Sequence, residues 1–337
     1  ADAAYRLACE GTAMLWRGDF HNARQLLQAM ARRVERKPRR APAAPATAAE
    51  AFHRYRLAQS QRVRTLGMLL LPFDDDYRLP LRRAPDVREA CAAAYGPAAG
   101  PFVASLRELL GLIGAHEWRK KGVAVPALGA RIHPHYGVFA PVRGEYVDLV
   151  AAAPLPAACA LAFDIGTGTG VLAAVLASRG IAHIVATDRD PRALACAAEN
   201  LARLGLAARV EVTAADLFPP GRAPLIVCNP PWLPARAASP LERAVYDPGS
   251  RMLMGFIGGL AAHLDPGGEG WLVLSDLAEH LGLRTRDELL AAFDAGGLQM
   301  AGRLDAKPSH PRVADRSDPL HAARVAELTS LWRLTAR

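Results

Sequence analysis

Cysteine is scarce in this chain of 337 residues, and what there is forms no pattern. The five cysteines are scattered, with no CxxC pair and no spacing typical of metal ligands. This excludes a disulfide framework and a cysteine-based zinc site. We therefore expect free thiols, as in a reducing compartment, and predict a cytoplasmic protein. The cysteines are Cys9, Cys91, Cys159, Cys196 and Cys228.

Long apolar runs are also missing. The most apolar stretch, residues 149–163, is interrupted by Pro154 and Pro156 and is too short to span a bilayer. The first residues show neither the basic stretch nor the apolar run of a signal peptide. We expect no membrane segment.

Acidic residues are few in the first part of the chain. Of the net charge of +8, residues 1–150 carry +9 and residues 151–337 carry −1. A basic surface, including the segment 32–40, attracts nucleic acid or an acidic protein, but arginine also serves only to keep a surface soluble. Both interpretations stay open. Neither the histidine pair at 133 and 135 nor the acidic run 74–76 completes a ligand set, so we predict no metal.

Length and an apolar content of 51% predict two domains. We expect a helical N-terminal domain over residues 1–120 that recognises the substrate, with an extended, proline-rich linker at about 37–47. A β-hairpin connector follows over 121–145, and residues 146–337 form the second domain. Apolar residues at helical spacing predict helices over residues 2–16, 20–36, 57–71, 86–95 and 102–113.

From residue 160 the pattern alternates between strands and helices, which predicts an α/β, doubly wound, mostly parallel sheet with helices on both faces. The last two strands, 298–304 and 328–334, are expected to pair antiparallel. The earlier strands are predicted at 160–165, 183–188, 210–214, 225–229 and 271–275, and the helices at 168–179, 191–204, 252–264 and 286–295.

A glycine-rich turn follows the first of these strands. Glycines at 166, 168 and 170 let the backbone turn sharply and let a ligand approach a helix N-terminus. The glycines alone fit a dinucleotide as well as S-adenosylmethionine (SAM). Asp164 favours SAM, because a carboxylate beside the loop suits the ammonium of a methionine moiety and would repel a pyrophosphate. The product would then be S-adenosylhomocysteine.

Two further acidic residues end the next strands. Asp188 is placed to accept both hydroxyls of a ribose, whereas Asp190, just before Pro191, suits a helix N-cap. Asp216 is placed to accept the adenine N6 proton, with Leu217 covering the ring. A plain surface aspartate at 216 is the competing interpretation.

Asn229-Pro230-Pro231-Trp232 stands at the end of the fourth strand, where ligands of open α/β sheets bind. The nitrogen of an amide or heteroaromatic amine is a poor nucleophile. The Asn229 side-chain oxygen and the Pro230 carbonyl could accept its two N–H bonds and stabilise positive charge that develops on it. Trp232 offers a stacking face, and Pro231 helps to stiffen the loop.

With these motifs the chain resembles the class I SAM-dependent methyltransferases that carry an Asn-Pro-Pro-aromatic motif, among them the release-factor and ribosomal-protein glutamine N-methyltransferases. The segment 137–147 is similar to the one that leads into their fold, and the segment 246–253 is similar to the stretch that follows their active-site loop. The resemblance implies a seven-stranded, Rossmann-like sheet with an antiparallel last strand. It implies SAM contacts from Asp164, Gly166, Thr167, Gly168, Gly170, Asp188, Asp216, Leu217 and Asn229, and acceptor contacts from Phe139, Asn229, Pro231 and Trp232.

The acceptor itself stays open at this level. A protein glutamine amide is the leading hypothesis, because the resemblance favours that branch. A nucleic-acid base, either adenine N6 or guanine N2, is the second, with the basic N-terminal half as its clamp. A small-molecule biosynthetic enzyme that uses SAM is the third.

Overall fold

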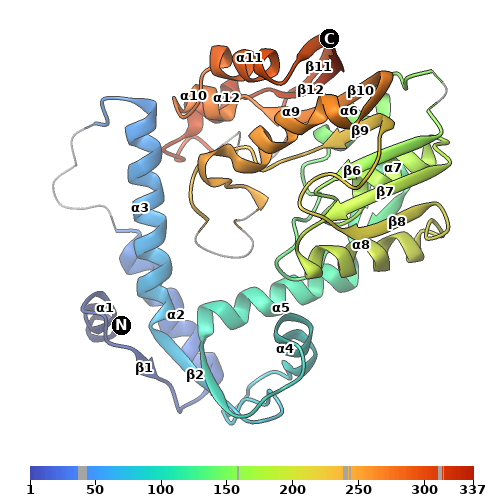
Figure 1. Cartoon of the computed structure of the whole chain (residues 1–337). Coiled ribbons are helices and arrows are strands. Elements are labelled where there is room, and N and C mark those ends of the chain that lie inside the picture. Colours follow the sequence, from blue (N-terminus) through green and yellow to red (C-terminus); the bar gives the residue numbers. More distant parts are fainter. Residues whose placement is uncertain (37–43, 158, 238–241, 243, 310–312, 314) are drawn as a thin grey trace. The chain divides into compact units, whose positions relative to one another are not determined.

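A computed structural model describes residues 1–36, 44–157, 159–237, 242, 244–309, 313 and 315–337 (Figure 1). The chain divides into two compact units. Unit 1 contains Ala1–Ala46 and Glu50–Lys120, and unit 2 contains Thr47–Ala49 and Lys121–Arg337. Most of the predicted linker, residues 37–43, lies outside the described residues.

Unit 1 is built mainly from helices. α2 illustrates why they form: Phe20, Ala23, Leu27 and Met30 recur at helical spacing and are all buried, and the Asp19 side chain accepts hydrogen bonds from the first free backbone N–H groups. The helices are α1 (Asp2–Cys9), α2 (Phe20–Val34), α3 (Ala48–Gly67), α4 (Arg88–Tyr95) and α5 (Leu106–Lys121).

A small sheet accompanies these helices and corrects three of the helix predictions. β1 (Met14–Leu15) pairs parallel with β2 (Leu69–Phe73), and β2 pairs antiparallel with β3 (Phe102–Ser105). The helices predicted over 2–16, 57–71 and 102–113 are therefore wrong at one end each. The residues at those ends pair instead with strands that lie far apart in the sequence, and Leu69 and Leu71 are buried there, which helical spacing cannot reveal.

Unit 2 begins with the expected hairpin of β4 (Val123–Val125) and β5 (Ala130–Ile132), joined by the short 3₁₀ helix η1 (Pro126–Leu128). Helix α6 (Glu145–Ala152) follows and was not predicted. Its apolar residues run on into residues 153–163, so the pattern gave no boundary for a separate helix.

The seven-stranded sheet of unit 2 confirms the predicted α/β fold. The strand order is β11-β12-β10-β9-β6-β7-β8. The pairs between β10 and β8 are parallel, and β12 is antiparallel to both of its neighbours. The strands are β6 (Leu161–Ile165), β7 (His183–Asp188), β8 (Val210–Ala214), β9 (Ala223–Cys228), β10 (Leu264–Ser275), β11 (Leu298–Ala306) and β12 (Thr329–Ala336).

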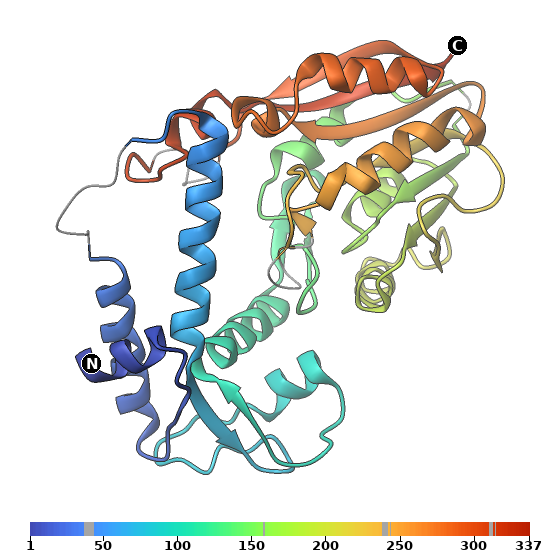
Figure 2. The ribbon, with the colours of Figure 1, turned by 60° about the vertical axis from the view of Figure 1, so that its left-hand side comes forward.

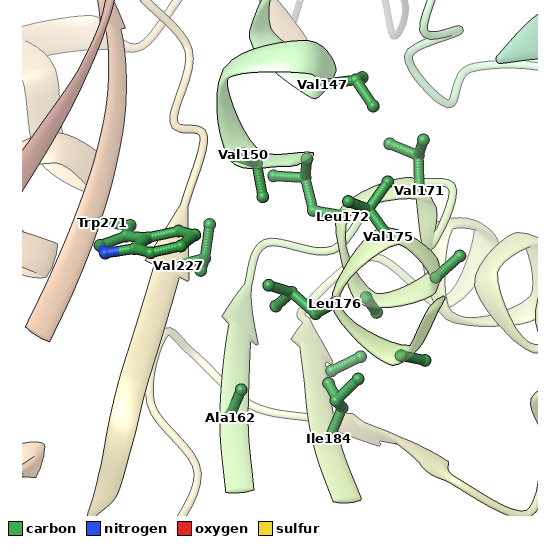
Figure 3. Packing of buried hydrophobic residues seen from close by; sticks show 14 of the residues in the cluster. Val147, Val150, Ala162, Val171, Leu172, Val175, Leu176, Ile184, Val227 and Trp271 are labelled. Atoms are coloured by element: carbon green, nitrogen blue, oxygen red, sulfur yellow. The ribbon is translucent and has the colours of Figure 1, made fainter. Parts of the chain in front are cut away.

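Helices cover both faces of this sheet. On one face α6, α7 (Val171–Ser178) and α8 (Pro191–Arg203) bury their apolar residues against the central strands; Figure 3 shows Leu176 of α7 directed toward these strands and Leu172 beside Val150 of α6. On the other face α9 (Arg251–His263) and α11 (Arg286–Ala295) do the same, and Figure 2 shows them in orange alongside the C-terminal strands. Each fully buried Leu or Val contributes about 1.5–3 kcal/mol.

The described residues of unit 2 also include the short helices η3 (Pro248–Ser250), α10 (Leu277–His280) and α12 (His321–Ala326). Among the described residues, no helix has both the length and the apolar character that crossing a membrane requires.

Candidate active site

The carboxyl ends of the parallel strands bring the predicted site residues to one edge of the sheet. Ile165, the last residue of β6, pairs with Thr187 on one side and with Cys228 on the other. The glycine loop, Asp188 and Asn229 directly follow these three residues. The chain leaves β6 toward β7 on one side and returns to β9 on the other, so this edge is the topological switch point, where α/β sheets bind ligands.

The glycine loop needs its glycines. Gly166, Gly168 and Gly170 have φ angles of 70°, 56° and 79°, which side-chain-bearing residues rarely adopt. A Cβ atom on Gly166 would come within 2.3 Å of the Met252 Cε atom, whereas one on Gly168 would meet nothing closer than 4.0 Å. The loop therefore packs against α9 at Gly166 and leaves space beside Gly168.

Asp164 lies in β6 below this loop and is only 1% exposed. Its Oδ2 atom accepts hydrogen bonds from Thr167 Oγ1 (2.6 Å) and from the backbone N–H of Ala173 (3.1 Å). Burial raises the pKa of the Asp164 carboxyl from 3.8 to about 6, although these two hydrogen bonds act in the opposite direction. Asp164 thus connects the glycine loop, through Thr167, to the first turn of α7, through Ala173. Its contact with a methionine ammonium stays a prediction.

Asp188 connects β7 to the glycine loop. Its Oδ2 atom accepts from the backbone N–H of Gly168 (3.1 Å), and its Oδ1 atom accepts from that of Asp190 (2.9 Å). Burial raises the pKa of the Asp188 carboxyl, and these backbone N–H groups oppose the rise. Asp190 caps α8, as expected, by accepting from the N–H of Arg192. The ribose contact of Asp188 stays a prediction.

Asp216 and Leu217 lie after β8, against the start of α9. The Asp216 carboxylate is exposed and faces Arg251 (Nη2–Oδ2 3.3 Å). Leu217 has a φ of 78°, and its carbonyl accepts a hydrogen bond from Thr187 Oγ1 (2.6 Å). A Cβ atom on Gly255 would lie 2.6 Å from Leu217 Cδ1, so this glycine in α9 makes room for the leucine. Their adenine contacts stay predictions.

The Asn-Pro-Pro-Trp segment carries a contact within itself. The Trp232 indole Nε1–H donates a hydrogen bond to Asn229 Oδ1 at 2.9 Å. Pro230 is buried, Asn229, Pro231 and Trp232 are half-buried, and Trp232 packs against the apolar core on both sides of the sheet. A carbonyl oxygen has two lone pairs, so Asn229 Oδ1 retains capacity for a second N–H donor.

Known proteins match this part of the chain. Residues 130–294 match the family described as "Methyltransferase small domain". These residues form a SAM-dependent methyltransferase domain.

Two curated relatives align with the methyltransferase domain. The "Release factor glutamine methyltransferase" of Cereibacter sphaeroides is 38% identical over 186 residues, which are 49% of this chain and 66% of the relative. The "Ribosomal protein L11 methyltransferase" of Sorangium cellulosum is 33% identical over 159 residues, 46% of this chain and 43% of the relative. The chain thus spans about two thirds or less of these relatives' length.

Among solved structures, a ribosomal protein L11 methylase from Lactobacillus delbrueckii subsp. bulgaricus is 19% identical, with a TM-score of 0.40, and the match covers 61% of this chain and 86% of that one.

The loop of the methyltransferase domain fits SAM, which the family uses as cofactor. The open side of Gly168 lets a ligand approach the backbone. The adjacent Asp188 carboxylate is anchored through the same residue, with lone pairs left over for ribose hydroxyls. Hydroxyl acceptors beside an open glycine turn are what a nucleoside requires.

The segment before α6 lies against the methyltransferase core. Phe139 is half-buried and packs on the face covered by α6 and α7. The backbone N–H of His133 donates to Asn200 Oδ1 (2.8 Å), and His135 Nε2 lies 2.7 Å from Glu199 Oε2, both on α8. Within the described ranges, no three His, Cys, Asp or Glu side chains are arranged to hold a metal ion. The predicted acceptor contact of Phe139 stays a prediction.

Arg143 is the site residue that sequence reasoning missed. Its guanidinium lies over the Trp232 ring, with Cζ 4.9 Å from the centroid. Nε bonds to Glu145 Oε1 at 2.6 Å, and Nη2 bonds to Glu327 Oε1 at 2.9 Å. Glu327 also accepts from Ser275 Oγ, at the end of β10. Arg143 belongs to the segment 137–147, which the family resemblance points out. Glu327 lies 184 positions further on, and no local sequence pattern links the two residues.

Proposed function

We propose that this protein transfers the methyl group of SAM to the side-chain amide nitrogen of a glutamine in another protein. The observation that carries the proposal is the position of Asn229. Its side-chain oxygen stands at the end of β9, next to the glycine loop that ends β6, and Trp232 holds it there. The names of the two curated relatives support a protein as the acceptor.

SAM, when bound, supplies a methyl group on a positively charged sulfur that a nitrogen can attack. In the proposal Asp188 binds the ribose, Asp216 and Leu217 bind the adenine, and Asp164 favours the ammonium of the methionine part. The backbone of the glycine loop would lie against the bound cofactor. The remaining contacts come from Gly166, Thr167, Gly168 and Gly170, with a minor one from Asn229, whose main role is toward the acceptor.

The acceptor nitrogen needs activation, because resonance with the carbonyl removes its lone pair from attack. Asn229 Oδ1 and the Pro230 carbonyl accept its two N–H bonds and turn the lone pair out of conjugation. The same two oxygens stabilise the positive charge that forms on the nitrogen as the methyl group arrives. No general base is required before transfer, because the proton leaves only after the new bond has formed. The rings of Trp232 and Phe139 cover the amide plane.

Unit 1 has the role of choosing the acceptor protein in this proposal, and the cytoplasm is the proposed location. The basic charge of residues 1–150 suits an acidic surface on that protein. The same charge also suits the phosphates of a nucleic acid, so a nucleic-acid base is the alternative acceptor.

The experiment that tests the proposal labels all three acceptor classes at once. Lysate from cells that lack this protein is incubated with the purified protein and SAM carrying a labelled methyl group, then separated into protein, RNA, DNA and small molecules. The Asn229→Ala variant is the control for labelling by other enzymes. We expect label in one protein band that this variant does not produce. Label confined to nucleic acid or to small molecules would contradict the proposal.

A further inference from the structure

Beneath the Asn-Pro-Pro-Trp loop lies a buried group of charges that the proposed chemistry does not use. The side chains of Glu145 and Glu327 are 6% and 2% exposed, and Arg143, at 18%, lies between them. The second Glu145 oxygen, Oε2, is buried without a hydrogen-bond partner. One positive and two negative groups therefore meet in a place where charges are costly to bury.

The two glutamates hold the Arg143 guanidinium in one orientation. The two glutamates bind different nitrogens of the guanidinium, Nε and Nη2, so they fix both its position and its rotation. Its carbon then lies 4.9 Å from the centre of the Trp232 ring, within the range of a cation–π contact. The indole is thereby linked to α6 through Glu145 and to the end of α12, just before β12, through Glu327.

The indole in turn fixes the Asn229 amide. An indole N–H can only donate a hydrogen bond, so the atom that faces it must be the amide oxygen and not the amide nitrogen. If the amide were rotated by 180°, an N–H group would face the indole N–H and repel it. A rotated amide would also present a donor to the N–H groups of an acceptor amide, which the proposed mechanism cannot use.

We propose that Arg143 is a positioning residue that acts through Trp232 and keeps the Asn229 side-chain oxygen directed at the acceptor nitrogen. The effect of this positioning on the reaction rate rests on the proposed function. Arg143 itself touches neither acceptor nor cofactor in this account. Its contribution is the fixed orientation of one hydrogen-bond acceptor, whose displacement by about 1 Å is enough to cost about a hundredfold in rate.

The first test needs no acceptor molecule. Protein labelled with ¹⁵N-tryptophan gives one indole N–H signal for each of its five tryptophans, and the Trp232 signal is the one missing from the Trp232→Phe variant. In Arg143→Met we expect this signal to move and its hydrogen exchange to become at least tenfold faster. Arg143→Lys keeps the charge but not the fork of donors, so we expect an intermediate effect.

A matched control exists in the same unit. Arg303 lies 5.0 Å from the centre of the Trp332 ring and bonds to Asp305, so it combines the same two kinds of contact away from the loop. Arg303→Met should move the Trp332 signal and leave that of Trp232 unchanged. If Arg143→Met fails to fold, as judged by the other four indole signals, Arg143→Met combined with Glu327→Gln removes the excess charge. An unchanged Trp232 signal in a folded Arg143 variant would overturn the proposal.

The second test uses the acceptor protein once it is labelled. We expect Arg143→Met to lower kcat at least tenfold while the KM for SAM stays within twofold. In the Trp232→Phe background, the same Arg143 change should cost less than threefold, because the residue it acts through is already altered. An equal loss in both backgrounds would contradict action through Trp232. If the Trp232 signal moves in Arg143→Met as expected but no methylated glutamine is found, the proposed function is contradicted, and the positioning of Trp232 by Arg143 still holds.

Discussion

Replacing Asp164 by asparagine separates the structural role of this residue from its predicted role in binding SAM. Both observed hydrogen bonds, from Thr167 and Ala173, end on the same oxygen, Oδ2. A carboxamide oxygen in that place accepts both, so the loop keeps its shape. What the substitution removes is a negative charge in a place that is 1% exposed.

The magnitude follows from the shift in pKa. Burial raises the Asp164 pKa from 3.8 to about 6. The difference corresponds to about 3 kcal/mol, at about 1.36 kcal/mol per unit. Well below pH 3.8 the carboxyl is protonated in both states and costs nothing. As the pH rises from 3.8 to 6, the unfolded chain loses the proton first, so the native state loses stability; above pH 6 the full cost applies.

The assay is urea unfolding of the wild type and of Asp164→Asn at several pH values between 4 and 7.5. The free energy of unfolding of the variant, relative to the wild type, should rise by about 2.5 kcal/mol across this range, because a small part of the cost already applies at pH 4. A buried amide N–H group without a partner adds a cost of about 1–3 kcal/mol, but that cost does not depend on pH. A difference that stays constant with pH, or that falls as pH rises, would refute the account of Asp164.

SAM extends the same experiment to binding. An ammonium beside Asp164 stabilises the charged carboxylate, so saturating SAM should remove most of the wild type's loss of stability between pH 4 and 6. Calorimetry at pH 7.5 should give a SAM affinity at least tenfold weaker for Asp164→Asn. Equal affinities would mean that Asp164 supports only the loop.

Four other substitutions, one of them a control, test further residues of the site. Asn229→Ala should lower methyl transfer to the labelled protein at least a hundredfold, with SAM affinity by calorimetry within threefold of the wild type; full activity would contradict the mechanism. Asp188→Ala should weaken SAM binding at least tenfold. Its neighbour Asp190→Ala, which removes only a helix cap, should cost about 1 kcal/mol of stability and leave SAM affinity unchanged; matching losses of affinity would mean that the ribose acid is misassigned. Gly166→Ala should cost about 2 kcal/mol or more in thermal or urea unfolding, because its φ is 70° and its Cβ would meet Met252; a neutral effect would show that the loop can rearrange.

The sheet of unit 2 could be predicted because its signals are local. Buried parallel strands are apolar throughout, and the helices between them repeat every 3.6 residues, so the alternation from residue 160 onward is visible without any long-range contact. The small sheet of unit 1 gave no such signal. Met14 becomes part of a strand because Leu69 lies beside it, and Leu70 because Leu15 and Ser105 lie on its two sides.

The candidate site divides in the same way. The positions of Gly166, Asp188 and Asn229 at neighbouring strand ends followed from spacing and from the rule for open sheets. The partners of the side chains did not follow. The bond from Trp232 to Asn229 depends on rotamers, and the approach of Glu327 to Arg143 depends on how the C-terminal strands return to the sheet.

Chemical identification of the methylated group tests the central claim most directly. The acceptor protein, labelled by the wild type with ¹⁴C-methyl SAM, is hydrolysed completely in hot acid, and the volatile products are separated from the amino acids. An N-methylated glutamine amide releases its label as methylamine, together with unlabelled glutamate. We predict that the label is recovered as methylamine, and that the Asn229→Ala reaction yields none. Label recovered as methanol, or retained on lysine, arginine or a nucleobase, would contradict transfer to a glutamine amide.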